Sequence, residues 1–269
     1  MLPVRQLFAL PPLFTPRDRD CVHDRVLECA RSDPRVVAGA VVGSLANKPG
    51  DRWSDLDLTF AVAEEVHVHD VLENWSERLT DEFGAVCLFD LFSGGAIYRV
   101  FLLNGCLQFD LSISPAIQFG AIGPNFRLLF GTAIEKPFIG PPSARELFGY
   151  AIHHAVRAQV CIERGRYWQA EYWITSLRDK AMSLACRSLE LPAYYGRGFD
   201  DLPDDIHEEF TDTLIHSLDK TELVRALTST VEALFRHGAE VGELSATIKL
   251  RLRELIRLSK AEGTAGKEE

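Results

Sequence analysis

Residues 36–60 read VVAGAVVGSLANKPGDRWSDLDLTF, and this stretch decides the fold. It opens with an apolar run, residues 36–42, that is typical of a buried strand and ends at Gly43 and Ser44. Glycine has no Cβ, so the backbone can approach a ligand closely there, and the amides that open the next turn point toward an anion. We therefore expect Gly43 and Ser44 to form a phosphate-binding turn.

A second strand, residues 56–62, brings two carboxylates together. Side chains alternate along a strand, so Asp55, Asp57 and Thr59 share one face while the apolar residues between them face the core. Like charges this close are costly unless a cation lies between them. Adjacent carboxylates supply the hard oxygen ligands that suit Mg²⁺ bridging a substrate's phosphates. The spacing thus predicts a metal site at Asp55 and Asp57.

A third carboxylate, Asp110, belongs to an expected hairpin. Asn104-Gly105 separates apolar runs at residues 97–103 and 106–113, which is the pattern of a two-residue type I′ turn. In that register Arg99 faces Asp110, and Asp110 lies on the more polar face of the hairpin. Two interpretations stay open: Asp110 is a third acid of the site, or it forms an ordinary Arg99–Asp110 cross-strand pair on a solvated face.

The two halves of the chain differ in pattern. A further strand at residues 85–92 and helices at 18–30 and 68–82 predict an α+β first half with a mixed sheet flanked by helices. After Ser143 the apolar residues recur at helical spacing, which predicts a helical bundle. The junction, residues 135–142, contains three prolines and a glycine. We expect one domain at residues 1–140, a helical domain at 141–262 and a disordered tail at 263–269.

The composition argues against two kinds of binding partner, duplex nucleic acid and a membrane. The chain has 29 Lys and Arg against 39 Asp and Glu, a formal net charge of -10, so it lacks the basic track that binds duplex nucleic acid. Its six cysteines include no C-x-x-C pair, which favours reduced thiols and a cytoplasmic location. No apolar run reaches the length of a membrane span, so a membrane partner is not expected.

The ordered motif of Gly43-Ser44, then Ser54–Leu58 with its two aspartates, then a lone Asp110 in an apolar strand resembles the signature of the polymerase β-like nucleotidyltransferase superfamily. Together with the helical second half, it resembles the branch of aminoglycoside and lincosamide (antibiotic) nucleotidyltransferases. The resemblance covers residues 36–113 by motif. It implies a catalytic domain at residues 1–140 and a helical domain that forms a wall of the cleft for acceptor and nucleotide.

The resemblance also implies roles for individual residues. Asp55, Asp57 and Asp110 would hold two Mg²⁺ ions, with the triphosphate on the Gly43-Ser44 turn. Asp110 would also take the proton of the acceptor hydroxyl, and an alternative base would come from the helical half. That half would further supply cations for the phosphates, although such residues can equally be solvated helix charges paired with nearby acids. The helical residues concerned are Glu171 as the alternative base and Arg178 and Lys180 as the cations.

The activity implied is Mg²⁺-dependent transfer of a nucleoside monophosphate, AMP from ATP or the equivalent from another NTP, with release of pyrophosphate. The acceptor would be a hydroxyl of a small polar molecule such as an aminoglycoside-like or lincosamide-like antibiotic, giving antibiotic resistance. Two alternatives stay open: modification of a protein partner in a toxin–antitoxin type of system, and a non-catalytic nucleotide sensor. The expected partners are the NTP and the acceptor, for a cytoplasmic monomer or homodimer.

Overall fold

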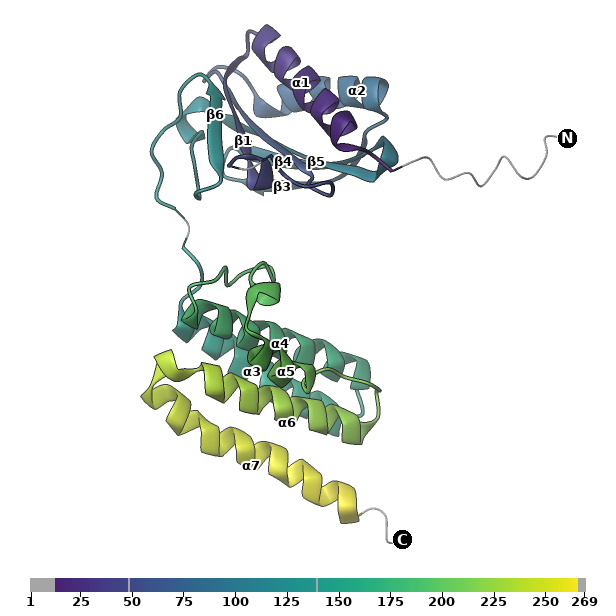
Figure 1. Cartoon of the computed structure of the whole chain (residues 1–269), viewed down its shortest axis with the longest axis vertical. Coiled ribbons are helices and arrows are strands. Elements are labelled where there is room, and N and C mark those ends of the chain that lie inside the picture. Colours follow the sequence, from purple (N-terminus) through teal and green to yellow (C-terminus); the bar gives the residue numbers. More distant parts are fainter. Residues whose placement is uncertain (1–12, 48, 139, 266–269) are drawn as a thin grey trace, which may run out of the picture. The chain divides into compact units, whose positions relative to one another are not determined.

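A computed structural model of the chain describes residues 13–47, 49–138 and 140–265. The chain forms two compact units, Met1–Ile139 and Gly140–Glu269. Figure 1 shows that the first combines a sheet with helices and that the second is helical. The predicted α+β class, a mixed sheet flanked by helices and followed by a helical bundle, is confirmed.

The first unit contains, in chain order, α1 (Pro16–Ser32), β1 (Val36–Val42), β2 (Leu56–Val62), α2 (Val68–Phe83), β3 (Val86–Ser93), β4 (Ala96–Leu103), β5 (Leu107–Pro115) and β6 (Phe126–Phe130). Its six-stranded sheet has the order β3-β4-β5-β2-β1-β6. The β2–β5 pair is parallel and the other neighbours are antiparallel. The sequence pattern missed β6, which is short and lacks apolar–polar alternation.

Helices α1 and α2 cover one face of the sheet (Figure 1). Thr15 begins α1 with a capping box, and Gly84, at φ 62°, ends α2 in the left-handed conformation. Apolar side chains of both helices pack against the inward-facing residues of the strands, among them Leu58, Phe60, Phe109 and Leu111. Because strand residues alternate, Asp57 and Asp110 lie on the opposite face of the sheet.

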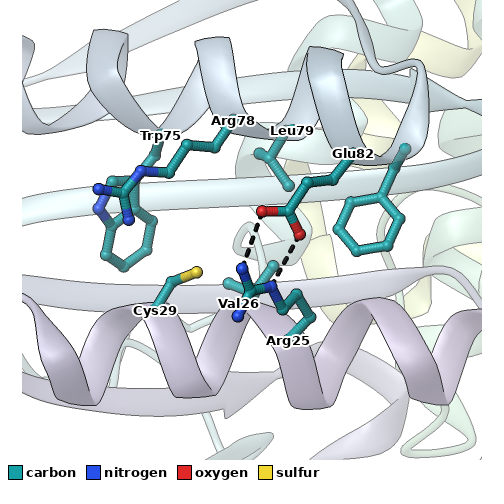
Figure 2. Close-up of a pocket in the computed structure, with 8 residues that line it drawn as sticks. Arg25, Val26, Cys29, Trp75, Arg78, Leu79 and Glu82 are labelled. Atoms are coloured by element: carbon teal, nitrogen blue, oxygen red, sulfur yellow. Dashed lines mark hydrogen bonds and ion pairs between the residues drawn. The ribbon is translucent and has the colours of Figure 1, made fainter.

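The groove between α1 and α2 holds a pocket lined by Val26, Cys29, Leu79 and their neighbours (Figure 2). The Arg25 guanidinium spans it, with Nε 2.7 Å from Glu82 Oε2 and Nη2 2.9 Å from Glu82 Oε1. This pocket lies on the helix-covered side of the sheet, so it is separate from the face that carries Asp57 and Asp110.

Asp33 ties α1, β1 and α2 together. Its carboxylate accepts hydrogen bonds from Arg35 Nε and Nη2, at 2.9 and 2.8 Å, and from Trp75 Nε1 at 3.1 Å. The Arg35 hydrogen bonds, with a smaller contribution from the Trp75 bond, lower the pKa of Asp33 to about 2 against the opposing effect of burial.

A depressed acid pKa stabilises the folded state above the pKa of the unfolded chain, about 3.9, and this stabilisation is lost as the pH falls toward 2. We expect Asp33→Asn to lower the free energy of unfolding at pH 7 by up to about 2 kcal/mol. The variant should also lose less stability than the wild type between pH 4 and 2, as measured by urea unfolding. An identical acid profile for the two proteins would contradict this role.

The second unit contains α3 (Ala144–Glu163), α4 (Tyr167–Ser188), α5 (Asp204–Thr211), α6 (Lys220–His237) and α7 (Glu243–Ala265). Ser143 begins α3 with a second capping box, and buried alanines let α3, α4 and α6 pack closely. Helix α7 extends to Ala265, three residues into the predicted tail, and residues 266–269 lie outside the described residues. Within the described part of the chain, no helix is long and apolar enough to cross a membrane.

Candidate active site

Strand β1 ends in a tight turn at Gly43. Gly43 has a φ of 67° and starts a short 3₁₀ turn, Gly43–Leu45, on which Ser44 is exposed. A Cβ placed on Gly43 would overlap Asp57 Oδ2 and lie 2.8 Å from Asp57 Cγ. Glycine is therefore required twice, for the left-handed backbone and for the close approach of the turn to the Asp57 carboxylate.

Two of the predicted carboxylates are neighbours in the sheet. In the parallel β2–β5 pair, Asp57 is in register with Asp110. The flanking residues, such as Leu58 and Leu111, are fully buried in the core beneath α1 and α2, so both aspartates project from the other face. Asp55 lies directly before β2, two residues from Asp57 and thus on the same side by alternation.

Charge and burial act together at Asp110. Burial raises the pKa of the Asp110 carboxyl, a hydrogen bond from Gln108 Nε2 at 3.0 Å opposes this, and the negative charge of Asp55 raises the pKa further. Asp55 is therefore close enough to Asp110 to repel it. Such a group of acids gains from a cation, because the cation offsets their mutual repulsion.

Tyr98 lies beside the candidate carboxylates, and the sequence analysis missed it. It lies in β4, half-buried, and burial raises the pKa of its hydroxyl to about 12, with the charges of Asp57 and Asp110 adding to the effect. Tyr98 is thus a protonated phenol beside two carboxylates. The signal that identifies it is the correct hairpin register, because β4 residues at even numbers from 98 to 102 share the face of Asp110.

The predicted hairpin register is wrong by one residue. Strands β4 and β5 are joined by three residues, Asn104–Cys106, with Gly105 at φ 74° and Cys106 at φ 62°. Consequently Val100, and not Arg99, pairs with Asp110. A shift of one residue moves every side chain of a strand to its other face.

Arg99 lies on the helix-covered face, where it is almost fully buried. Its guanidinium donates two hydrogen bonds of 2.7 Å to the Asp90 carboxylate. It also forms an ion pair with Glu73 Oε1 at 2.9 Å and donates to Ser76 Oγ at 2.8 Å. The predicted Arg99–Asp110 pair is therefore absent. Arg99, on β4, instead links α2 and β3 through its contacts with Glu73, Ser76 and Asp90.

We expect Arg99→Met to lower the free energy of unfolding by on the order of 2–3 kcal/mol, because buried charge-assisted hydrogen bonds are lost and Asp90 is left without its partner. Nucleotide binding by the folded variant should be unchanged. Urea unfolding and calorimetric titration measure the two quantities. Unchanged stability together with lost nucleotide binding would contradict a structural role.

The side chains of the candidate site fit Mg²⁺, whose preferred protein ligands are carboxylate oxygens. Asp57 is in register with Asp110, and the charge of Asp55 acts on Asp110, so the three carboxylates share one region of the sheet. Among the residues that the structure describes, however, no group of three or more His, Cys, Asp or Glu side chains is already arranged to hold a metal ion. The assignment of Asp55, Asp57 and Asp110 as metal ligands therefore stays a prediction.

The residues predicted from the helical half all lie on α4. Arg178 donates to Thr213 O at 3.1 Å and to Thr175 Oγ1 at 3.2 Å, and burial lowers its pKa against the opposing charge of Glu171. Glu171 accepts a hydrogen bond of 2.9 Å from Thr175. Lys180 bonds to Asp179 at 2.7 Å, one of the helix pairings weighed from the sequence. Their roles toward a nucleotide or acceptor stay predictions.

A scan against protein-family models finds no match, and a search of the curated proteins finds none either. Among solved structures, the chain is similar to an aminoglycoside 6-adenyltransferase from Bacillus subtilis, at 13% identity and a TM-score of 0.37 over 90% of this chain and 99% of that one. It is also similar to the Elizabethkingia meningoseptica cyclic dinucleotide synthase CdnE with GTP and Apcpp, at 9% identity and a TM-score of 0.31 over 86% and 96%. Both likenesses are structural and distant, and both proteins are polymerase β-like nucleotidyltransferases.

Proposed function

We propose that this chain is a nucleotidyltransferase that transfers a nucleoside monophosphate from an NTP, ATP first, to a hydroxyl group. The observation that carries the proposal is the contact of the Gly43 turn with Asp57, which is itself in register with Asp110. A phosphate-binding turn beside paired carboxylates is what phosphoryl chemistry requires, because the phosphates need both amide donors and a cation.

In the proposed reaction, Asp55, Asp57 and Asp110 hold Mg²⁺, which when bound would neutralise charge on the phosphates. The Gly43-Ser44 turn seats the triphosphate. The acceptor hydroxyl gives its proton to Asp110, its oxygen bonds to the α-phosphorus, and the bond to pyrophosphate breaks. Burial makes Asp110 a stronger base than an exposed aspartate, which favours it over Glu171 for this step.

We further propose a small polar acceptor of the aminoglycoside-like or lincosamide-like kind. The formal net charge of -10 supports the aminoglycoside-like kind, because it attracts a polycationic molecule and repels a polyanion. A role in antibiotic resistance would follow from that acceptor, and the free cysteines support a cytoplasmic location.

The test is pyrophosphate release from each of the four NTPs with Mg²⁺, across aminoglycosides, lincosamides and simple polyols. We expect release that depends on one acceptor class and is highest with ATP. Release that needs a protein acceptor would overturn the small-molecule acceptor and keep the transferase. Nucleotide binding without release toward any acceptor would replace the transferase with a nucleotide sensor.

A further inference from the structure

Strand β3 forms one edge of the sheet and exposes an unusual amount of apolar surface. It is eight residues long, so its free edge extends for about 26 Å. Large apolar side chains of β3 are exposed by between 51% and 73%: Val86, Leu88, Phe89, Leu91 and Phe92. They occupy both faces of the strand, since Leu91 pairs with Tyr98 and Phe92 pairs with Ile97 on opposite sides of β4.

The usual protection of a free edge is largely missing from β3. Edge strands are commonly blunted by Lys, Pro or inward charges, and β3 contains neither Lys nor Pro. Its one charge, Asp90, is already neutralised by the bidentate pair with Arg99. A bulge between Cys87 and Phe89 is the one protective feature of the strand.

The opposite edge of the sheet differs. Strand β6 has five residues and includes Arg127, whose Nε donates to Ala46 O at 2.9 Å. Leu128 is its most exposed large apolar side chain, at 42%. Of the two edges, β3 is therefore the longer and the more apolar, and its one charge is paired with Arg99.

We propose that β3 pairs antiparallel with β3 of a second copy of this chain, so that two sheets join across a two-fold axis. At roughly 150–200 Å² for a fully exposed large side chain, the five apolar residues of β3 expose on the order of 500 Å² per copy. Pairing of two copies along this edge buries up to about 1,000 Å² of side-chain surface together with the backbone of both edges, which is the lower end of the range for protein interfaces.

A second copy fits this edge better than an unrelated partner. In a two-fold interface the same patch serves both subunits, so it must be self-complementary. Strand β3 meets that condition: its backbone donors and acceptors match their own copy in antiparallel pairing, both faces are apolar, and its charge is paired internally. The net charge of -10 opposes association in general, and β3 adds little to that repulsion because its one charge, Asp90, is paired with Arg99.

The first test is sedimentation equilibrium of the full chain. The wild type should show twice the monomer mass of 30.1 kDa at micromolar concentration. Leu91→Lys and Phe92→Lys, which place a charge on either face of β3, should each weaken association at least 100-fold. Leu128→Lys, at the opposite edge, is the matched control and should remain dimeric. A monomeric wild type, or β3 variants that stay dimeric, would overturn the proposal.

The second test is hydrogen exchange of the β3 amides, which separates strand pairing from any other dimer. Amides of β3 that point away from β4 should be protected in the wild type and should exchange as fast as free amides in Leu91→Lys. Circular dichroism should show that both variants keep the fold, because the replaced side chains are exposed. A dimer whose β3 amides exchange freely would overturn the proposed pairing.

Discussion

Replacing Asp57 by Asn is expected to lower the rate of nucleotidyl transfer by about 100-fold or more while the fold remains intact. Asp57 lies between the other two parts of the site. The Gly43 turn approaches its carboxylate closely, and Asp110 is in register with it on the neighbouring strand. Asparagine keeps the shape but removes a charged ligand. Stabilisation of phosphoryl charge by a bound cation is worth several kcal/mol, so the rate should fall by about 10²–10³-fold or more.

The measurement is the rate of pyrophosphate release together with the thermal unfolding midpoint. Without metal, the midpoint should stay within a few degrees of the wild type. Mg²⁺ with NTP should raise the midpoint of the wild type and not that of the variant, because a ligand stabilises only a protein that binds it. Asp24→Asn, an exposed change of the same charge on α1, is the control and should keep full turnover. Full turnover in Asp57→Asn would refute the metal-site assignment.

The second large effect is expected for Gly43→Ala. An alanine at φ 67° is strained by about 1–3 kcal/mol, and its Cβ would also push against the Asp57 carboxylate. Displacement of a reacting group by about 1 Å can cost about 10²-fold in rate. We therefore expect turnover to fall about 100-fold, beyond any loss from reduced stability.

Gly165→Ala separates the two effects. Gly165 also has a positive φ, 65°, but no atom lies within 4 Å of the position that its Cβ would take. This control should lose stability from backbone strain and keep its turnover per folded molecule. Stability comes from urea unfolding and turnover from pyrophosphate release. Equal losses of turnover in both variants would show that contact with Asp57 is not the cause.

Much of the fold was predictable because it follows from local pattern. The runs at residues 36–42 and 56–62 begin and end where β1 and β2 do. A run of apolar residues indicates a buried strand by itself, and Gly43 marks the end of the first one. The hairpin was not fixed by its Asn-Gly signal, because Cys106 also adopts a left-handed conformation and lengthens the loop. One residue in a loop therefore decided that Val100, and not Arg99, is opposite Asp110.

The candidate site was predictable only in part, for a similar reason. Gly43 and Asp57 are close in sequence, and the antiparallel pairing of β1 with β2 places the Gly43 turn beside the Asp57 carboxylate. The pairing of Asp57 with Asp110 depends on the parallel contact of β2 with β5, which no local pattern encodes. The position of Tyr98 depends instead on the register of the β4–β5 hairpin, which the loop length sets. The exposed edge of β3 was likewise hidden, because an apolar run does not reveal whether a neighbour covers it.

The most direct measurement is calorimetric titration of the wild type and Asp57→Asn with a non-hydrolysable ATP analogue, with and without Mg²⁺. It needs no acceptor, so it tests the proposed nucleotide site alone. We predict that the wild type binds the analogue tightly only with Mg²⁺ and that Asp57→Asn loses this metal-dependent part of the affinity. Equal, metal-independent binding by the two proteins, or no binding by the wild type, would contradict a metal–nucleotide site at Gly43, Asp57 and Asp110.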